Sequence, residues 1–201
     1  MACNNSLDVL REAIDGGTNV VIVNRVSGGF LYNSGDLQLG WRETDLTGLD
    51  GRTRNHNRSY LWRFHPEQVD GERVYRIQAR PDRERYRRYI TIHVHTDDLS
   101  QNGIRWEEWR DDEEDQDEID AQRWHVIETC EGGVAIVPHY RRGRSYVLGL
   151  WQRLVENHGC VRPQRIFYDG YIPIACTWEI LREREVDLID AAQVGAGGGD
   201  G

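Results

Sequence analysis

The pattern of hydrophobic and polar residues changes near the N-terminus from a helical period to the alternating period of strands. Apolar residues over positions 7–14 share one helical face, with Ser6 as the expected N-cap and Gly16 as a stop signal. From residue 18 to about residue 181, short apolar runs of strand length alternate with turn residues. We therefore expect an N-terminal arm with a short helix, residues 1–17, and then an all-β domain, residues 18–181.

The all-β region contains three copies of one pattern. Each copy has an apolar first strand, a strand led by an aromatic residue, and a later strand that starts with Trp. The aromatic-led and Trp strands begin, in order, at Phe30 and Trp62, Tyr89 and Trp124, and Tyr146 and Trp178. These two marks are 32, 35 and 32 residues apart, a nearly constant period. The expected repeats span about residues 18–70, 71–132 and 133–181.

Turn residues predict how the repeats join. An Asp-Gly pair at residues 70–71 follows the first Trp strand, and a Gly-Gly pair at residues 132–133 follows the second. Both pairs permit the positive φ of tight hairpins, so each Trp strand should fold back onto the next repeat's first strand. No fourth repeat follows the third Trp. Residues 177–181 should therefore pair with residues 20–23, closing a barrel and removing exposed sheet edges.

Three units of about four short strands, each ending in a Trp strand, resemble the β-trefoil. The Trp near the end of each unit is similar to that of the ricin B-like lectin branch, whose signature is Gln-x-Trp. The second repeat matches the signature at Gln122 and Trp124, and the opening at residues 21–31 resembles fungal members of that branch. The resemblance implies an all-β β-trefoil, a closed barrel with a hairpin cap, and short helices at the termini. Another antiparallel barrel or sandwich is the alternative.

In this interpretation the repeated tryptophans pack inside the domain. Phe64, Val126 and Ile180 follow their Trp residues by two positions and share their face of the strand. The residues assigned to the structural repeat core are Trp62, Gln122, Trp124 and Trp178.

Segments outside the repeat pattern are expected to be loops or tails. Acidic residues 107–120 lengthen the second repeat and are interpreted as a solvated loop, opposite in charge to the Arg-rich segment 76–88. Residues 182–201 are expected to contain a short helix, with Glu/Arg pairs, and a flexible Gly-rich tail.

Composition excludes some classes of protein. The 201 residues carry a net charge of −9, which argues against general nucleic-acid binding, and no apolar run is long enough to span a membrane. All 25 basic residues are Arg and none is Lys. Codon bias and selection against lysine tagging both remain open. The second would suit a toxin-like or effector-like binder.

Cysteines and the N-terminal segment bear on the compartment. Four scattered cysteines are too few for a disulfide framework, although Cys160 and Cys176 can pair on sequence grounds. The start of the chain has no apolar region of signal-peptide length. We expect a cytoplasmic protein, and leaderless secretion or delivery fits equally well.

No motif predicts catalysis, a cofactor or a metal. His93 and His95 share a strand face but have no third ligand at a recognisable spacing, and residues 107–120 lack the order of a calcium loop. His158 and Cys160 lie close in sequence, but adjacency in a chain does not activate a nucleophile. The sequence therefore predicts no enzyme, no cofactor and no metal site.

Sugar binding needs an aromatic platform with polar partners. In ricin-like sites an Asp follows the second strand and an Asn precedes Gln-x-Trp. Here the residues at the Asp position of the three repeats are Asn33, Ile92 and Gly149, and the residue before Gln122 is Ala121. The galactose-type residues therefore cannot be carried over to this chain. A sugar site would instead use residues outside the repeat core: Asn33, Trp41, Trp106, Trp109, Trp151 and Asn157.

Two functions from different classes follow. The first is a non-catalytic, lectin-like protein that binds a glycan or glycoprotein, which the repeat signature favours. The second is a protein-binding trefoil, such as a protease inhibitor or a host-directed effector. The missing sugar-site residues, the charged segments and the polar loops 48–59 and 141–144 favour this second function.

Overall fold

The structure is a computed structural model of the chain, and it describes part of the backbone. The described residues are 5–26, 30–33, 39–42, 61–79, 88–93, 103–108, 116–129, 132–140, 146–151, 158–165 and 172–183. In several strands the backbone alone is described. Every structural statement below concerns these residues.

Strands dominate the described residues, and the helices are short. The strands are β1 (Val20–Asn24), β2 (Phe30–Asn33), β3 (Leu39–Arg42), β4 (Leu61–Val69), β5 (Glu72–Ala79), β6 (Arg88–His93), β7 (Gly103–Glu108), β8 (Trp124–Glu128), β9 (Val134–Pro138), β10 (Tyr146–Trp151), β11 (His158–Arg165) and β12 (Trp178–Arg182). The helices are α1 (Ser6–Asp15), α3 (Gln116–Asp120) and the 3-10 turn Ile174–Cys176. The fold is mainly β, as the alternating pattern predicted.

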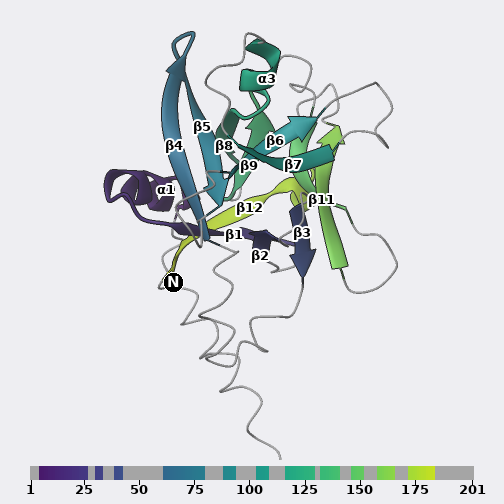
Figure 1. Cartoon of the computed structure of the whole chain (residues 1–201). Coiled ribbons are helices and arrows are strands. Elements are labelled where there is room, and N and C mark those ends of the chain that lie inside the picture. Colours follow the sequence, from purple (N-terminus) through teal and green to yellow (C-terminus); the bar gives the residue numbers. More distant parts are fainter. Residues whose placement is uncertain are drawn as a thin grey trace, which may run out of the picture.

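All strands belong to one antiparallel sheet system (Figure 1). The strand order is β10-β11-β3-β2-β1-β12-β9-β8-β5-β6-β7, and β4 joins β1 to β5. The β4–β5 hairpin is the longest pair, with register from Trp62 opposite Ala79 to Val69 opposite Glu72. Strands distant in sequence therefore lie side by side, which a chain of local hairpins alone would not produce.

The first and last described strands pair with each other. The register runs from Val20 opposite Arg182 to Asn24 opposite Trp178, which confirms the predicted pairing. The strand reaches Leu181 as predicted and continues one residue further, because Arg182 belongs to β12 and not to the C-terminal segment. The backbone groups of both residues hydrogen bond to β1, which favours strand over helix at these positions. Residues 184–201 lie outside the described residues.

Both predicted hairpins form. In the first, Asp70 and Gly71 have φ angles of 53° and 81°, and they connect β4 directly to β5. Positive φ at both central residues of this two-residue loop matches the right-handed twist of the strands. In the second, Gly132 has a φ of 76° but Gly133 has no positive φ, and residues 129–133 separate β8 from β9, so the connection is longer than the tight turn expected from the Gly-Gly pair. Each of these Trp strands therefore folds back onto the strand that follows it, β4 onto β5 and β8 onto β9.

The three repeated tryptophans make the same hydrogen bond. Each indole is fully buried, and its Nε1–H donates to a backbone carbonyl at 2.9 Å. The donor and acceptor pairs are Trp62 and Leu31, Trp124 and Ile90, and Trp178 and Leu148. Because a buried N–H without an acceptor is costly, each of these carbonyls stabilises the buried tryptophan from which it accepts. We call these tryptophans and the apolar residues around them the tryptophan core.

The neighbours of these tryptophans are also buried. Phe64 and Ile180 are 5% and 1% exposed, and Val126 packs partly buried against the same cluster. Gln122 is buried, and its Nε2–H donates to the Thr91 hydroxyl at 3.2 Å. The Gln of the Gln-x-Trp signature therefore holds the aromatic-led strand of its own repeat.

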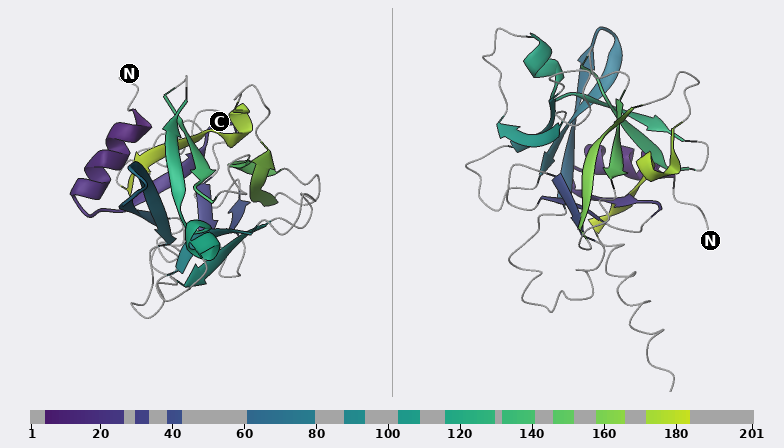
Figure 2. Two further views of the ribbon diagram at one scale, coloured as in Figure 1. Left: turned by 90° about the horizontal axis from the view of Figure 1, so that it is seen from above. Right: turned by 90° about the vertical axis from the view of Figure 1, so that its right-hand side faces the viewer.

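Helix α1 covers one side of the tryptophan core. Val9, Leu10 and Ala13 are buried in the core cluster, and the helix packs against β12 and β4 (Figure 2). It ends at Gly16, and Gly17 follows with a φ of 59°, as the stop signal predicted. Within the described segments, no helix has the length and apolar character required to cross a bilayer.

The predicted N-cap of α1 is wrong by one residue. Asn5 is the N-cap, and its side-chain oxygen accepts a hydrogen bond from the Leu7 N–H at 2.9 Å. Ser6 is fully buried, and its hydroxyl accepts a hydrogen bond from the Ile180 N–H at 3.2 Å. Both residue types are good caps, so tertiary contact with β12 decides between them.

The acidic segment is not wholly a loop. Glu107 and Glu108 end β7, and residues 116–120 form α3, whereas residues 109–115 lie outside the described residues. Helix α3 is stabilised by acidic residues in its first turn and by a Gln116-to-Asp120 hydrogen bond one turn apart. Charge density by itself does not exclude a short helix, because acidic residues favour the first helical turn.

Strands β4, β5, β8 and β9 have two different faces. Tyr75 lies opposite Trp124 in the β5–β8 register, and both belong to the tryptophan core. Positions one residue along each strand point to the opposite side. That side, which we call the polar face, carries Glu67, Glu72, Arg76 and His125, together with Arg123 and His139, which adjoin the ends of β8 and β9.

Candidate functional site

Four of the six predicted carbohydrate-binding positions lie in described strands, where their backbone is described. They are Asn33 in β2, Trp41 in β3, Trp106 in β7 and Trp151 in β10. Trp109 and Asn157 lie outside the described residues.

Two of these positions are equivalent in the repeat pattern. Trp41 lies opposite Leu31 in the strand register, and Trp106 lies opposite Ile90. Leu31 and Ile90 are the residues whose carbonyls accept the indole hydrogen bonds. The corresponding position in the third repeat is Pro163. The sequence did not reveal this equivalence, because it did not fix the register of the aromatic-led hairpins.

The sheet brings the strands of three candidate tryptophans together. Trp151 pairs with Cys160 of β11, and Trp41 pairs with the adjacent Gly159 from the other side. Strand β7, which contains Trp106, contacts both β3 and β11. The tryptophan-bearing strands therefore adjoin around β11, although they come from three different repeats.

The galactose-type position of the second repeat is closed. Ile92 stands where the sugar-binding Asp would be and is 1% exposed, and Ala121 stands where the Asn would be and is 8% exposed. The Ile92 N–H donates to the Ala121 carbonyl at 2.9 Å. Two buried apolar side chains joined through the backbone offer no partner for a sugar hydroxyl.

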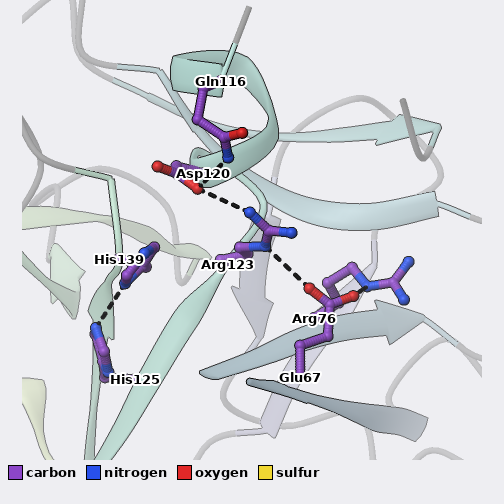
Figure 3. Close-up of polar contacts among 7 residues, drawn as sticks. All are labelled: Glu67, Arg76, Gln116, Asp120, Arg123, His125 and His139. Atoms are coloured by element: carbon purple, nitrogen blue, oxygen red, sulfur yellow. Dashed lines mark hydrogen bonds and ion pairs between the residues drawn. The ribbon is translucent and has the colours of Figure 1, made fainter. Parts of the chain in front are cut away.

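The polar face contains a carboxylate–arginine cluster, formed by Glu67, Arg76, Asp120 and Arg123 (Figure 3). The Arg123 guanidinium donates to Glu67 and to Asp120, at 2.9 Å in each case. Arg76 forms an ion pair with the other oxygen of Glu67. These side chains are 15–21% exposed, so solvent screens the pairs less than it screens surface pairs. The cluster fastens α3 and β8 to the β4–β5 hairpin.

A second group, the histidine cluster, lies on the same face and consists of Glu72, His125 and His139. His125 Nε2 and His139 Nδ1 are 3.0 Å apart, at hydrogen-bond distance (Figure 3). His125 Nε2 is 3.7 Å from a Glu72 carboxylate oxygen. One ligand atom from each residue lies within 4.8 Å of the other two. Among the described residues, these three side chains converge in a way that can hold a metal ion.

The sequence prediction missed this cluster. It weighed His93 and His95, but β6 ends at His93 and His95 lies outside the described residues. A usable signal existed in the predicted hairpin after Trp124. Once β8 folds onto β9, His125 lies opposite Val137, and His139 is two residues further on the same face. Glu72, from another hairpin, could not be added without the tertiary structure.

Cys176 is not equipped to act as a nucleophile. It is 1% exposed and forms no disulfide, so it does not pair with Cys160. Burial raises the pKa of the Cys176 thiol from 9.0 to about 11. Since the thiolate is the reactive form, this thiol is inert near neutral pH.

Comparison with known proteins gives a likeness of fold. No protein-family model matches the chain, and no curated protein matches it by sequence. Among solved structures, cytolethal distending toxin from Actinobacillus actinomycetemcomitans is similar, with a TM-score of 0.55 and 12% identity. That match covers 82% of this chain and 90% of the toxin chain.

Two further structures support the same fold. The BEL β-trefoil matches with a TM-score of 0.54 and 9% identity, covering 82% of this chain and 92% of that one. The binding domain of botulinum neurotoxin serotype D matches with a TM-score of 0.50 and 8% identity, covering 83% of this chain and 41% of that one. At such identities the likeness concerns the arrangement of strands, which is that of β-trefoil proteins.

Proposed function

We propose that this protein is a non-catalytic binding module whose three repeats form a closed β-trefoil barrel, and that its ligand is a glycan or glycoprotein. The repeated indole-to-carbonyl hydrogen bond is the observation that carries the proposal, because one contact recurs in all three repeats. The β1–β12 pairing and the likeness to the BEL β-trefoil support the closed arrangement. Fold alone does not define a ligand, so the site needs its own argument.

For the site, we propose the region around β11, with Trp151 as the principal platform and Asn157 as a polar partner. Trp41 and Trp106 stand opposite fully buried residues in their hairpins, which suits a packing role. Trp151 is the last residue of β10 and directly precedes the connection to β11. An indole at a strand end can stack on the apolar face of a sugar ring.

The absence of catalysis is part of the proposal. Cys176 is the one cysteine whose side chain is described, and its raised pKa opposes a nucleophilic role. The described histidines His125 and His139 contact each other and the Glu72 carboxylate, and catalysis would in addition need a hydroxyl or thiol held by one of them.

A glycan array tests the function directly. We expect the wild-type protein to bind a defined set of glycans, and Trp151→Ala to abolish that binding. Trp151→Phe, which keeps an aromatic ring, should retain part of it. Thermal unfolding of all three proteins must show equal stability. A blank array for the folded wild-type protein contradicts the carbohydrate proposal.

A protein partner is the second candidate. The closed, apolar position at Ile92 and Ala121 favours it, because the second repeat then lacks a galactose-type site. The similarity in fold to a cytolethal distending toxin also fits a host-directed role. Affinity capture from cell extract separates the candidates. A free sugar should release a glycoprotein bound through its glycan, and a directly bound protein or protease should remain attached.

The absence of lysine from the sequence fits the proposal that the protein is a host-directed effector. If the chain acts in a cytosol that tags lysines for degradation, added lysines should shorten its lifetime. Arg11→Lys and Arg63→Lys place lysine at exposed positions, and the first retains the ion pair with Asp8. The half-life of the double variant in a eukaryotic cytosol should fall relative to the wild-type protein. An unchanged half-life would contradict the idea.

A further inference from the structure

The geometry points to a metal site formed by Glu72, His125 and His139, which would bind Zn²⁺ or a similar transition-metal ion. Both histidines come from the β8–β9 hairpin, and the carboxylate comes from the start of β5. The site is separate from the sugar-binding region proposed around β11, and it does not depend on that proposal.

Two of the three distances between donor atoms are close to the spacing that zinc requires, and all three are within 4.8 Å. A tetrahedral Zn²⁺ with bonds of about 2.0–2.1 Å holds neighbouring ligand atoms roughly 3.3 Å apart. The two ring nitrogens are 3.0 Å apart, and His125 Nε2 is 3.7 Å from the carboxylate oxygen. Glu72 is the ligand that must adjust most. Its side chain is 60% exposed, so it is free to turn toward the ion.

The two imidazoles are held in place by the sheet. The His139 N–H donates to the Arg123 carbonyl at 2.8 Å, which continues the β8–β9 ladder, and the His139 side chain is buried. His125 sits within β8, opposite Val137. Without an ion, the N–H of one ring donates a hydrogen bond to the unprotonated nitrogen of the other ring. With an ion, both rings become neutral acceptors, and each lone pair has a partner.

Surrounding charges favour a cation at this place. Arg73 directly follows Glu72, and Arg123, two residues before His125, is paired with both Glu67 and Asp120. The Arg73 guanidinium lies 5.6 Å from the centre of the Tyr75 ring. The ligand set has one negative charge from Glu72, and its two nitrogens select zinc, nickel or copper over calcium and magnesium.

Three protein ligands leave one tetrahedral position open. Glu72 is exposed and His125 is partly exposed, so solvent can reach the ion. A water or a group from a bound partner can therefore complete the coordination. The ion would also join the β4–β5 hairpin to the β8–β9 hairpin. These two hairpins already pair through β5 and β8, where Tyr75 lies opposite Trp124.

Zinc titration of the untagged, chelator-treated full chain tests the site. By calorimetry, we expect one Zn²⁺ per chain and a higher thermal midpoint at about a hundredfold excess of zinc over its dissociation constant. Glu72→Gln and His125→Gln should each weaken binding by at least about tenfold. Co²⁺ in place of zinc should give the visible absorption of a tetrahedral site, which His125→Gln removes.

Two controls keep the result interpretable. His65→Gln changes a partly buried histidine of β4 that bonds to Gln78, outside the cluster, and should leave zinc affinity unchanged. The double change His93→Gln and His95→Gln should also leave it unchanged. The proposal fails if the wild-type chain binds no zinc, if binding survives both Glu72→Gln and His125→Gln, or if it is lost with His93 and His95. Since Glu72 and His125 are not fully buried, these variants should fold even if a change at His139 does not.

Discussion

The two faces of β5, β8 and β9 are built from alternate residues of the same strands, yet they differ in kind. On one face, Trp124 makes a contact that recurs with Trp62 and Trp178 in the other repeats. On the other face, the carboxylate–arginine and histidine clusters occur in a single described place (Figure 3). The same strands thus carry, on one face, a contact that recurs elsewhere in the chain and, on the other face, a group of charged and imidazole side chains.

The physical reason lies in what each face must satisfy. A core position has to fill a closed volume and provide an acceptor for a buried N–H, so few residue types fit. A partly exposed position has to satisfy only its nearest charges, and water can replace a lost partner. The polar face therefore admits more residue types than the tryptophan core.

The largest expected effect is on the core face. Trp62→Ala, Trp124→Ala and Trp178→Ala should each lower the free energy of unfolding by about 3–5 kcal/mol, because each leaves a large cavity. The matched Trp→Phe changes keep most of the volume but lose the indole N–H, and should cost about 1–2 kcal/mol. Urea denaturation measures both sets. A cost below about 1 kcal/mol for one of the alanine variants would break the equivalence of the three tryptophans.

The next effect lies within the polar face. Glu67→Gln removes the negative charge shared by Arg76 and Arg123 and should cost about 2 kcal/mol, less than a fully buried pair because the groups are partly hydrated. The matched control is Glu12→Gln. Glu12 pairs with Arg182 but is 62% exposed, so its loss should cost under about 1 kcal/mol. Equal costs for the two variants would show that burial does not strengthen the Glu67 pairs.

The stability of the fold should depend on pH through the Cys176 thiol. This thiol is buried in a small apolar cluster with Ala135 and Val137 of β9 and Val147 of β10. The unfolded thiol loses its proton near pH 9.0, whereas burial raises the pKa of the folded thiol to about 11. Ionisation therefore favours the unfolded state first as the pH rises. Stability should be unaffected below about pH 9 and fall by roughly 2 kcal/mol toward pH 11. Cys176→Ala should remove this loss, and an equal decline in both proteins would contradict it.

The smallest expected effect concerns the helix that covers the core face. Asn5→Ala removes the cap of α1 and its hydrogen bond to Leu7, at a cost of about 1 kcal/mol. Ser6→Ala should lower stability by a separate route, since the Ser6 hydroxyl accepts from β12 and not from α1. Thermal unfolding of the single and double variants distinguishes the two. If the stability losses of the two single variants add up to that of the double variant, the two residues act independently. If the double variant loses no more stability than one single variant, Ser6 takes part in capping α1.

Local patterns predicted the elements well where the side chain's role depends on near neighbours. The Asp70–Gly71 turn has the positive φ angles that a two-residue hairpin requires, and its register follows directly. The β1–β12 pairing was also predictable, because three copies of one unit leave the last strand without a following partner. The N-cap of α1 was not, since both candidates can cap and the deciding contact comes from residue 180.

The sequence by itself determined the β class, the hairpins and the recurrence of the buried tryptophans, because all three depend on period, turn residues and spacing along the chain. The tertiary structure decided which residues meet on the polar face. Glu72 reaches His125 and His139 through the pairing of two hairpins whose relative position no local pattern specifies. Chemistry that depends on side chains from separate hairpins is set by strand order and register, so it becomes visible once the sheet is assembled.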